Sequence, residues 1–179
     1  RRVLFRSEQK HTKFSLKIVS CRNYHHNKKY ILPIKPSPNL PDMQSVYMYP
    51  STAFFEGTVL SEGRGTDHPF CIFGHTSYND SLFSFTPTSR YGAKEPKLKN
   101  KKCFGWNVWK TDADELVKEI DKKVQIRYLL NAYNKFNPKD SFFITPKFDI
   151  YTEYFFNKIA GNSTLIDRKS TRLNSSHTD

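Results

Sequence analysis

The stretch PSTAFFEGTVLSEGRGTDHPF, residues 50–70, gathers reactive side chains on a flexible backbone. It holds Glu56, Glu62 and Arg64 among three glycines, three threonines and two serines. Glycine lets a backbone turn tightly or approach a ligand closely. Paired carboxylates beside a guanidinium are typical of sites that handle carbohydrates or phosphates. We therefore predict a compact loop over residues 50–70 in which the side chains of Glu56, Glu62 and Arg64 converge.

Outside this stretch, strand-like patterns occur in four places. Alternation of apolar and polar residues, or enrichment in aromatic and β-branched residues, is typical of strands and short extended segments. These patterns lie at residues 14–20, 45–51, 69–75 and 103–109. Four prolines in residues 32–42 predict extended or turn geometry, and the polar residues 78–102 predict a linker or long loop.

Helix-like patterns follow the last of these strands. Residues 121–136 carry one apolar stripe at helical spacing, formed by Ile126, Leu129, Leu130, Tyr133 and Phe136, and end before the stop signals Asn137 and Pro138. Thr111 with Asp114, or Asp112 with Glu115, is a pattern that caps an earlier helical turn. A last short helix is predicted over residues 152–160, ended by Gly161 and Asn162. The fold class that follows is mixed α/β.

Composition narrows the possible functions. No apolar run approaches the roughly 20 residues that span a bilayer. The cysteines, Cys21, Cys71 and Cys103, are widely spaced and form no C-x-x-C pair, so we expect buried structural thiols. The six histidines show neither H-x-x-x-H nor H-E-x-x-H spacing. We therefore expect no metal site and no cofactor.

The two ends of the chain, residues 1–7 and 168–179, are interpreted as translated adapter sequence and are excluded from fold reasoning. Setting aside three positive charges at the start and a net two at the end lowers the formal net charge from +12 to +7. A basic surface that remains can favour an anionic partner, although scattered lysines more often form a solvated surface.

Two chemistries compete for the central stretch. Residues 62–66, EGRGT, lack the G-x-x-x-x-G-K-[ST] spacing of a phosphate-binding loop. Glycosidases need two carboxyl groups about 5 to 9.5 Å apart, and Glu56 and Glu62 lie close enough in sequence to allow this. In the alternative reading, Glu56, Glu62 and Arg64 only stabilise a tight loop through internal hydrogen bonds.

A longer set of motifs resembles a known family. PSPNLP, YPSTAFFEGTVLSEGRGTDHPF, the following FG and KKCFGWNV closely resemble DUF1343, whose characterised members are NamZ-type exo-β-N-acetylmuramidases. The likeness runs from about residue 14 to residue 166. Departures occur at Val59, where the family usually has asparagine, and after Gly74.

The resemblance implies a domain organisation and an activity. Residues 8–77 would form the C-terminal end of a Rossmann-like catalytic domain, and residues 78–167 a truncated, smaller α+β C-terminal domain. The protein would remove terminal N-acetylmuramic acid from non-reducing ends of peptidoglycan fragments, in the periplasm or outside the cell. The family's principal acid would lie upstream, in a Pro-Glu-His-Gly stretch absent from this sequence, so the chain alone is expected to be inactive.

Site residues are assigned on this basis. Glu62 and Glu56 are expected to support catalysis, and Arg64 to bind the lactyl or peptide carboxylate of a muramyl group. The side chains expected to contact sugar hydroxyl or acetamide groups are Thr58, Ser61 and Thr66, with Asn39 as a wall residue. Two alternatives stay open: a basic, aromatic-rich nucleic-acid binder without a recognisable motif, and a non-catalytic wall-binding module.

Overall fold

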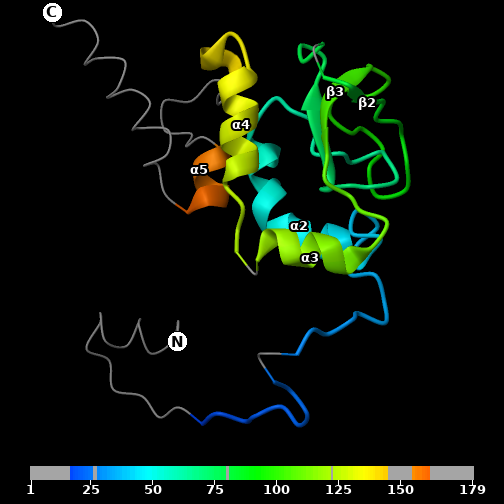
Figure 1. Ribbon diagram of the computed structural model, residues 1–179, viewed down its shortest axis with the longest axis vertical. Coiled ribbons are helices and arrows are strands. Elements are labelled where there is room, and N and C mark those ends of the chain that lie inside the picture. Colours follow the sequence, from blue (N-terminus) through cyan, green and yellow to red (C-terminus); the bar gives the residue numbers. More distant parts are fainter. Residues whose placement is uncertain (1–16, 26–27, 80, 122, 145–154, 162–179) are drawn as a thin grey trace, which may run out of the picture. The chain divides into compact units, whose positions relative to one another are not determined.

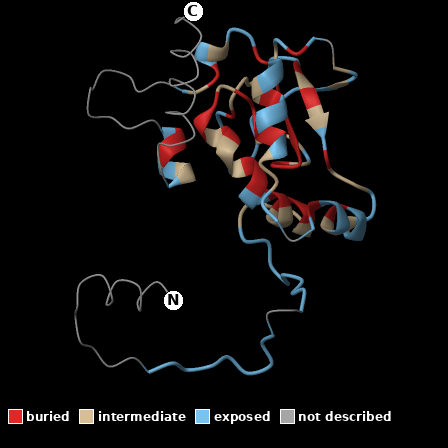
Figure 2. Cartoon of the chain, turned by 60° about the vertical axis from the view of Figure 1, so that its left-hand side comes forward, coloured by how far each residue is buried: buried red, intermediate tan, exposed pale blue. Residues whose placement is uncertain are grey.

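The computed structural model describes residues 17–25, 28–79, 81–121, 123–144 and 155–161, which fall into two units, Arg1–Ile31 and Leu32–Asp179. In the first unit the described residues form no helix or strand and are exposed (Figure 2). The strand predicted at residues 14–20 is therefore wrong for residues 17–20. No strand among the described residues of this unit pairs with it, and an isolated strand is not stable in water. Residues 14–16 and both proposed adapter tails lie outside the described residues.

The second unit contains all the regular elements described. In chain order they are α2 Met43–Thr52, the 3₁₀ helix η1 Ala53–Gly57, β1 Ile72–His75, β2 Phe83–Phe85, β3 Cys103–Asn107, α3 Ala113–Ile120, α4 Arg127–Lys135, the 3₁₀ helix η2 Lys139–Ser141 and α5 Phe155–Ala160 (Figure 1). The predicted mixed α/β class is confirmed.

The sheet is antiparallel, with strand order β1-β3-β2. The strand predictions at residues 69–75 and 103–109 are confirmed by β1 and β3, which pair so that Phe73 lies opposite Trp106. Strand β2 lies inside the segment predicted as a linker or loop, and its pairing with β3 shows that this segment belongs to the folded unit. The predicted domain boundary between residues 77 and 78 stays a prediction; β1 and β3 pair across it.

Helix α2 occupies residues predicted to be extended, so that prediction is wrong. The Asp42 side chain caps the helix by accepting a hydrogen bond from Ser45 N–H at 2.8 Å. The buried face of α2 is mostly polar, so it carries no apolar helical stripe; it consists of Gln44, Ser45, Met48, Ser51 and Thr52. Pro50 lies inside the helix, near its end.

Gln44, Ser51 and Thr52 satisfy their buried polar atoms through the backbone of other segments. Gln44 exchanges two hydrogen bonds with the backbone of Lys110, of 2.7 and 2.9 Å. Ser51 Oγ accepts from Gln125 N–H at 2.9 Å, and Thr52 Oγ1 donates to the Phe70 carbonyl oxygen at 2.9 Å. These hydrogen bonds stabilise the burial of polar side chains in α2.

The remaining helices follow the predicted positions but differ in detail. Asp112, a residue of one of the two predicted capping pairs, caps α3 by accepting from Asp114 N–H at 2.9 Å. Helix α4 is shorter than predicted, and Leu130 is 53% exposed although the apolar stripe included it. Its buried residues are Tyr128, Leu129 and Ala132. Tyr128 can take this place because its hydroxyl donates to Glu119 Oε1 at 3.1 Å.

Helix α5 is confirmed over the described part of the predicted range. Gly161, with φ of +75°, follows it and donates from its N–H to the Asn157 carbonyl oxygen at 2.8 Å. Phe156 of α5 is fully buried and packs edge-to-face on Phe143. The predicted helix start at residues 152–154 lies outside the described residues.

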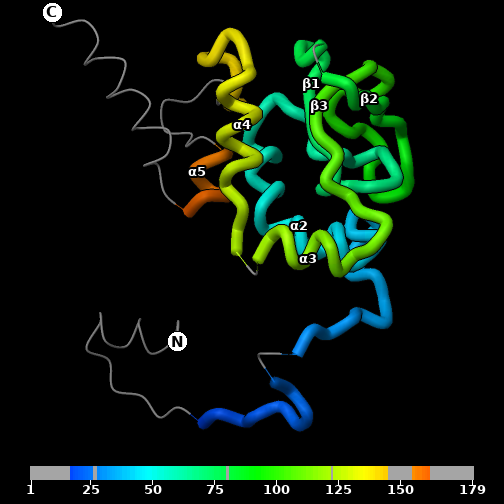
Figure 3. Tube along the Cα trace, in the orientation of Figure 1, coloured from blue at the N-terminus to red at the C-terminus, as the bar shows by residue number. Residues whose placement is uncertain are grey.

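The hydrophobic core lies between the sheet, η1 and the helices. Phe55 of η1 stacks on Phe73 of β1 with ring centroids 4.6 Å apart, and Phe73 stacks in turn on Trp106 of β3 at 5.5 Å. Helices α2 and α3 lie side by side (Figure 3). Phe55 anchors η1 in the core, which fixes the position of the backbone where the residues after η1 begin.

The predicted burial of the thiols is confirmed for Cys71 and Cys103 and wrong for Cys21. Cys21 belongs to the exposed first unit, whose described residues offer no core to receive it. Burial raises the pKa of Cys71 to about 12 and that of Cys103 to about 11. Both buried thiols therefore stay protonated and unreactive near neutral pH.

Candidate functional site

The candidate site lies on the turn that connects η1 to β1. Thr58 Oγ1 donates to the Phe55 carbonyl oxygen at 2.9 Å and accepts from Leu60 N–H at 3.2 Å, which closes the end of η1. Ser61 and Gly74 then exchange two backbone hydrogen bonds, of 2.9 and 3.0 Å. The turn is thereby fixed to the outer edge of β1.

Two glycines shape the turn after Ser61. Gly63 and Gly65 have φ of +81° and +82°, values that side-chain-bearing residues rarely adopt. Gly65 also accepts a hydrogen bond of 2.9 Å from Thr88 N–H, so it lies against the loop before β3. Glu62 accepts from Phe70 N–H at 2.7 Å through its carbonyl oxygen. The turn therefore places the side chains of residues 62 and 64 between η1 and this loop.

The structure brings Glu56, Glu62 and Arg64 together, as predicted. The loop predicted over residues 50–70 is wrong for residues 50–57, which belong to α2 and η1. Arg64 Nη2 donates to Glu56 Oε1 at 2.8 Å, and Arg64 Nε lies 3.6 Å from Glu62 Oε1. The Arg64 side chain is 34% exposed and Glu56 17%, whereas Glu62 is 2% exposed. The cluster therefore has one partly open residue, Arg64, with a buried carboxylate behind it.

A fourth charged residue, Lys97, completes the cluster. Its Nζ lies 3.1 Å from Glu62 Oε2 and donates to the carbonyl oxygens of residues 55, 56, 58 and 60 at 2.7 to 3.1 Å. Because the four carbonyls already exceed the three N–H groups of an ammonium, we treat the Glu62 contact as an ion pair. Burial lowers the pKa of Lys97, and the Glu62 carboxylate beside it opposes that shift. Glu62 therefore lies between two cations.

Arg64 lies against the ring of Phe70, which is buried. Its guanidinium carbon lies 5.3 Å from the centre of the Phe70 ring, within range of a cation–π interaction. Phe70 packs edge-to-face on Tyr49, with ring centroids 4.8 Å apart. Tyr49 is 40% exposed. Phe70 therefore contacts both the accessible Arg64 guanidinium and the partly exposed Tyr49 ring.

The hydroxyls expected to contact a sugar already have partners in the turn. Thr58 and Ser61 are almost fully buried, and Ser61 Oγ accepts from Gly63 N–H at 3.2 Å. Thr66 Oγ1 donates to the Gly63 carbonyl oxygen at 2.6 Å. Sugar binding by these hydroxyls stays a prediction, and their observed hydrogen bonds stabilise the turn.

Asn39 forms hydrogen bonds away from the ion cluster. Its Nδ2 donates to the Gly92 carbonyl oxygen at 2.9 Å, and its N–H to Ser37 Oγ at 3.2 Å. The hydrogen bond to Gly92 joins the proline-rich segment to the loop before β3. A role for Asn39 as a wall of the substrate site stays a prediction.

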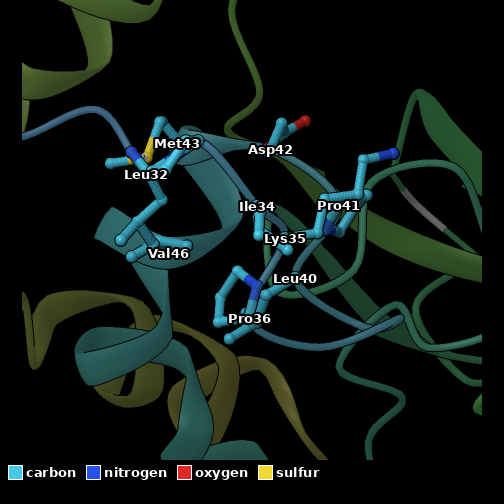
Figure 4. A pocket seen from close by; sticks show the side chains of 10 residues that line it. Leu32, Ile34, Lys35, Pro36, Leu40, Pro41, Asp42, Met43 and Val46 are labelled. Atoms are coloured by element: carbon cyan, nitrogen blue, oxygen red, sulfur yellow. Dashed lines mark hydrogen bonds between the residues drawn. The ribbon is translucent and has the colours of Figure 1, made fainter.

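The proline-rich segment itself lines a pocket of about 220 Å³ against the start of α2. Its lining side chains, shown in Figure 4, are mostly apolar, with Lys35 and Asp42 as the charged members. A ligand site needs a few polar groups that converge on the ligand and fix its orientation. The ion cluster meets this requirement better than the pocket.

Within the described ranges, no group of three or more histidine, cysteine, aspartate or glutamate side chains is placed to hold a metal ion. Among the same residues, no helix has the length and apolar character needed to cross a membrane.

A family comparison covers the turn and the residues that follow it up to position 172. The sequence model described as the C-terminal region of the exo-β-N-acetylmuramidase NamZ matches residues 47–172. The chain belongs to the NamZ C-terminal family. The site residues at positions 56 to 97 all lie inside the matched region, and Asn39 lies before it.

Two relatives of this NamZ-family chain are informative. Peptidoglycan β-N-acetylmuramidase NamZ of Bacillus subtilis is 30% identical over 149 residues, which is 74% of this chain and 32% of the relative. A crystal structure of a DUF1343 family protein from Bacteroides fragilis is 41% identical, with a TM-score of 0.65, covering 87% of this chain and 43% of that one. The chain thus spans about a third to two fifths of the relatives it matches.

Sequence reasoning missed Lys97 in this NamZ-family site. The lysine-rich run at residues 94–102 was visible, but nothing in its spacing distinguishes one lysine from the others. The one local signal is Pro96, the preceding residue, because proline restricts the backbone next to Lys97. Identifying Lys97 required the tertiary contacts, because its partners, from residue 55 to residue 62, lie 35 to 42 residues earlier in the chain.

Proposed function

We propose that the chain is part of a cell-wall glycosidase that acts on peptidoglycan by removing terminal N-acetylmuramic acid. Support comes from membership of the NamZ C-terminal family and from the Bacillus relative named as a peptidoglycan β-N-acetylmuramidase. Such an enzyme works where peptidoglycan lies, so the proposal includes a periplasmic or extracellular location.

The observation that carries the proposal is the partly exposed Arg64 guanidinium beside Glu56. Within the described residues, Arg64 donates one hydrogen bond to a side chain, from Nη2. Further N–H groups therefore remain for a ligand. Guanidinium groups bind carboxylates through two parallel hydrogen bonds. N-Acetylmuramic acid carries a lactyl carboxylate that N-acetylglucosamine lacks, and we assign Arg64 to this group.

The two glutamates fit a supporting role better than direct proton transfer. Glu62 is almost fully buried and lies between Lys97 and Arg64, so it has no open path to a glycosidic oxygen. Glu56 is committed to Arg64 at 2.8 Å. A general acid must reach the oxygen that it protonates. In this proposal Glu56 and Glu62 orient Arg64, and the principal acid comes from another part of the enzyme.

The buried, paired glutamates also favour a second candidate function. If no catalytic group approaches Arg64, the chain would bind muramyl groups without cleaving them, as a wall-binding module. This candidate shares the Arg64 assignment and differs only in the chemistry that follows binding.

A ligand pair tests the Arg64 assignment. Calorimetry should show that the chain binds N-acetylmuramic acid more tightly than N-acetylglucosamine. Arg64→Ala should weaken binding of N-acetylmuramic acid by about ten- to a hundredfold, as expected for loss of a charge-assisted contact. The control is Arg90→Ala, which removes a surface arginine paired with Asp67. Equal affinity for the two sugars would refute the assignment.

A further inference from the structure

Lys97 closes the turn that carries Arg64. Four carbonyl oxygens, from residues 55, 56, 58 and 60, point at its Nζ at 2.7 to 3.1 Å, and Glu62 Oε2 lies at 3.1 Å. The five oxygens come from eight consecutive residues. The side chain reaches them from the loop between β2 and β3.

Such an arrangement of oxygens needs a cation. Converging carbonyl dipoles and a carboxylate repel one another when no positive charge lies between them. An ammonium has three N–H groups, so the four carbonyl oxygens must share them, and its charge also stabilises the Glu62 carboxylate. The Lys97 ammonium therefore acts at this position as a fixed internal cation, comparable to a bound monovalent ion.

Lys97 touches both residues that hold Arg64. It contacts Glu56 through the carbonyl oxygen at 3.1 Å, while the Glu56 carboxylate accepts from Arg64. It contacts Glu62 through Oε2, while Oε1 of the same carboxylate lies 3.6 Å from Arg64 Nε. Loss of the ammonium would release the backbone at Glu56 and the carboxylate of Glu62 together.

We propose that Lys97 is the positioning residue of the muramyl site: its caged ammonium fixes Glu56 and Glu62, and through them the Arg64 guanidinium. The ligand part of this inference rests on the proposed function. The positioning part concerns the chain alone and can be measured without any ligand.

Three variants separate the charge from the packing of the side chain. Lys97→Met keeps the aliphatic stem and removes the ammonium, and Lys97→Ala opens space that methylammonium can enter. Lys99→Met is the matched control, because Lys99 lies in the same loop and pairs with the exposed Glu95. Tetramethylammonium serves as the control ion, since it carries the charge but has no N–H group.

The first readout is the NMR signal of the Arg64 side-chain N–H groups, which reports whether the guanidinium is held against Glu56. In Lys97→Met and Lys97→Ala the Arg64 guanidinium should rotate faster than in the unchanged protein, because it is no longer held. In Lys99→Met its rotation should stay slow. Methylammonium should restore slow rotation in Lys97→Ala, while tetramethylammonium should not. If Lys97→Ala does not fold alone, the yield on refolding with each ion replaces this readout.

The second readout is the affinity for N-acetylmuramic acid, which should fall about tenfold in Lys97→Met and recover in Lys97→Ala with methylammonium. An Arg64 side chain that stays ordered in Lys97→Met, or rescue equal for all ions, would overturn the inference. Methylammonium could restore the order of Arg64 in Lys97→Ala while neither this rescued variant nor the unchanged protein binds N-acetylmuramic acid. That result would mean that Lys97 positions Arg64 and that the proposed function is wrong.

Discussion

Glu62 is the residue whose surroundings are most unusual, since a 2% exposed carboxylate lies between Lys97 and Arg64. Removing one partner from a buried ion pair leaves the other charge uncompensated. We expect Glu62→Gln to lower the free energy of unfolding by about 3 kcal/mol, near the lower end of such losses because both cations are partly exposed. Urea denaturation measures this change.

Glu56→Gln is the matched control at the residue scale. Glu56 pairs with the same Arg64, but that pair is more exposed. Its loss should cost less than about 1 kcal/mol. Equal losses for the two variants would show that Lys97 and Arg64 do not depend on the Glu62 charge.

At the scale of the turn, Gly65 is expected to tolerate no side chain. A Cβ at Gly65 would lie 2.7 Å from Pro96 Cγ and closer still to the Thr88 carbonyl oxygen, in addition to the positive φ. Gly161 has a similar φ, with no atom within 4 Å of such a Cβ. Gly161→Ala should cost about 1 kcal/mol for the backbone alone.

Gly65→Ala should cost roughly 2 kcal/mol more, because it adds overpacking to the same backbone strain. Thermal unfolding of the two variants measures the difference. Matching melting temperatures would mean that the loop containing Thr88 and Pro96 does not lie against the turn as described.

Strand β1 carries a pH-dependent contribution through His75. Burial lowers the pKa of His75 from 6.5, and Lys101 lowers it further. As the pH falls, His75 is therefore protonated in the unfolded chain before it is protonated in the folded chain. The free energy of unfolding should fall as the pH drops below about 6.5 and level off below the folded-state pKa. Urea midpoints between about pH 7 and pH 5 should show this slope, and His75→Gln should reduce it. A slope unchanged by the substitution would remove His75 as its source.

Sequence patterns were sufficient to predict some of the helices and strands but not others. Strands β1 and β3 were predictable because aromatic and apolar residues such as Phe73 and Trp106 pack directly in the core. Helix α2 was not, because its buried face carries Gln44, Ser51 and Thr52, which bond to backbone atoms far away in the sequence. Burial of Tyr128 in place of Leu130 likewise depends on a hydrogen bond to Glu119 in another helix.

The same division applies to the candidate site. Convergence of Glu56, Glu62 and Arg64 was predictable, because glycines at positions 63 and 65 force the backbone between them to turn. Lys97 and the internal hydrogen bonds of Thr58 and Ser61 were not, since local spacing carries no information about long-range partners.

At the scale of the whole molecule, we expect this chain to bind muramyl groups without cleaving the glycosidic bond. Both glutamates of the site are paired, and a glycosidase needs an acid and a second group on opposite sides of the sugar. The chain alone should therefore release no N-acetylmuramic acid from a chromogenic muramyl glycoside. Turnover that disappears in Glu62→Gln would instead make Glu62 a catalytic residue.

Recognition of the lactyl carboxylate by Arg64 is the central claim, and the side-chain nitrogen resonances of Arg64 test it most directly. Titration with N-acetylmuramic acid should shift these resonances in proportion to binding, and titration with N-acetylglucosamine at the same concentrations should leave them in place. Shifts of equal size with both sugars, or none with N-acetylmuramic acid while resonances elsewhere move, would contradict the claim.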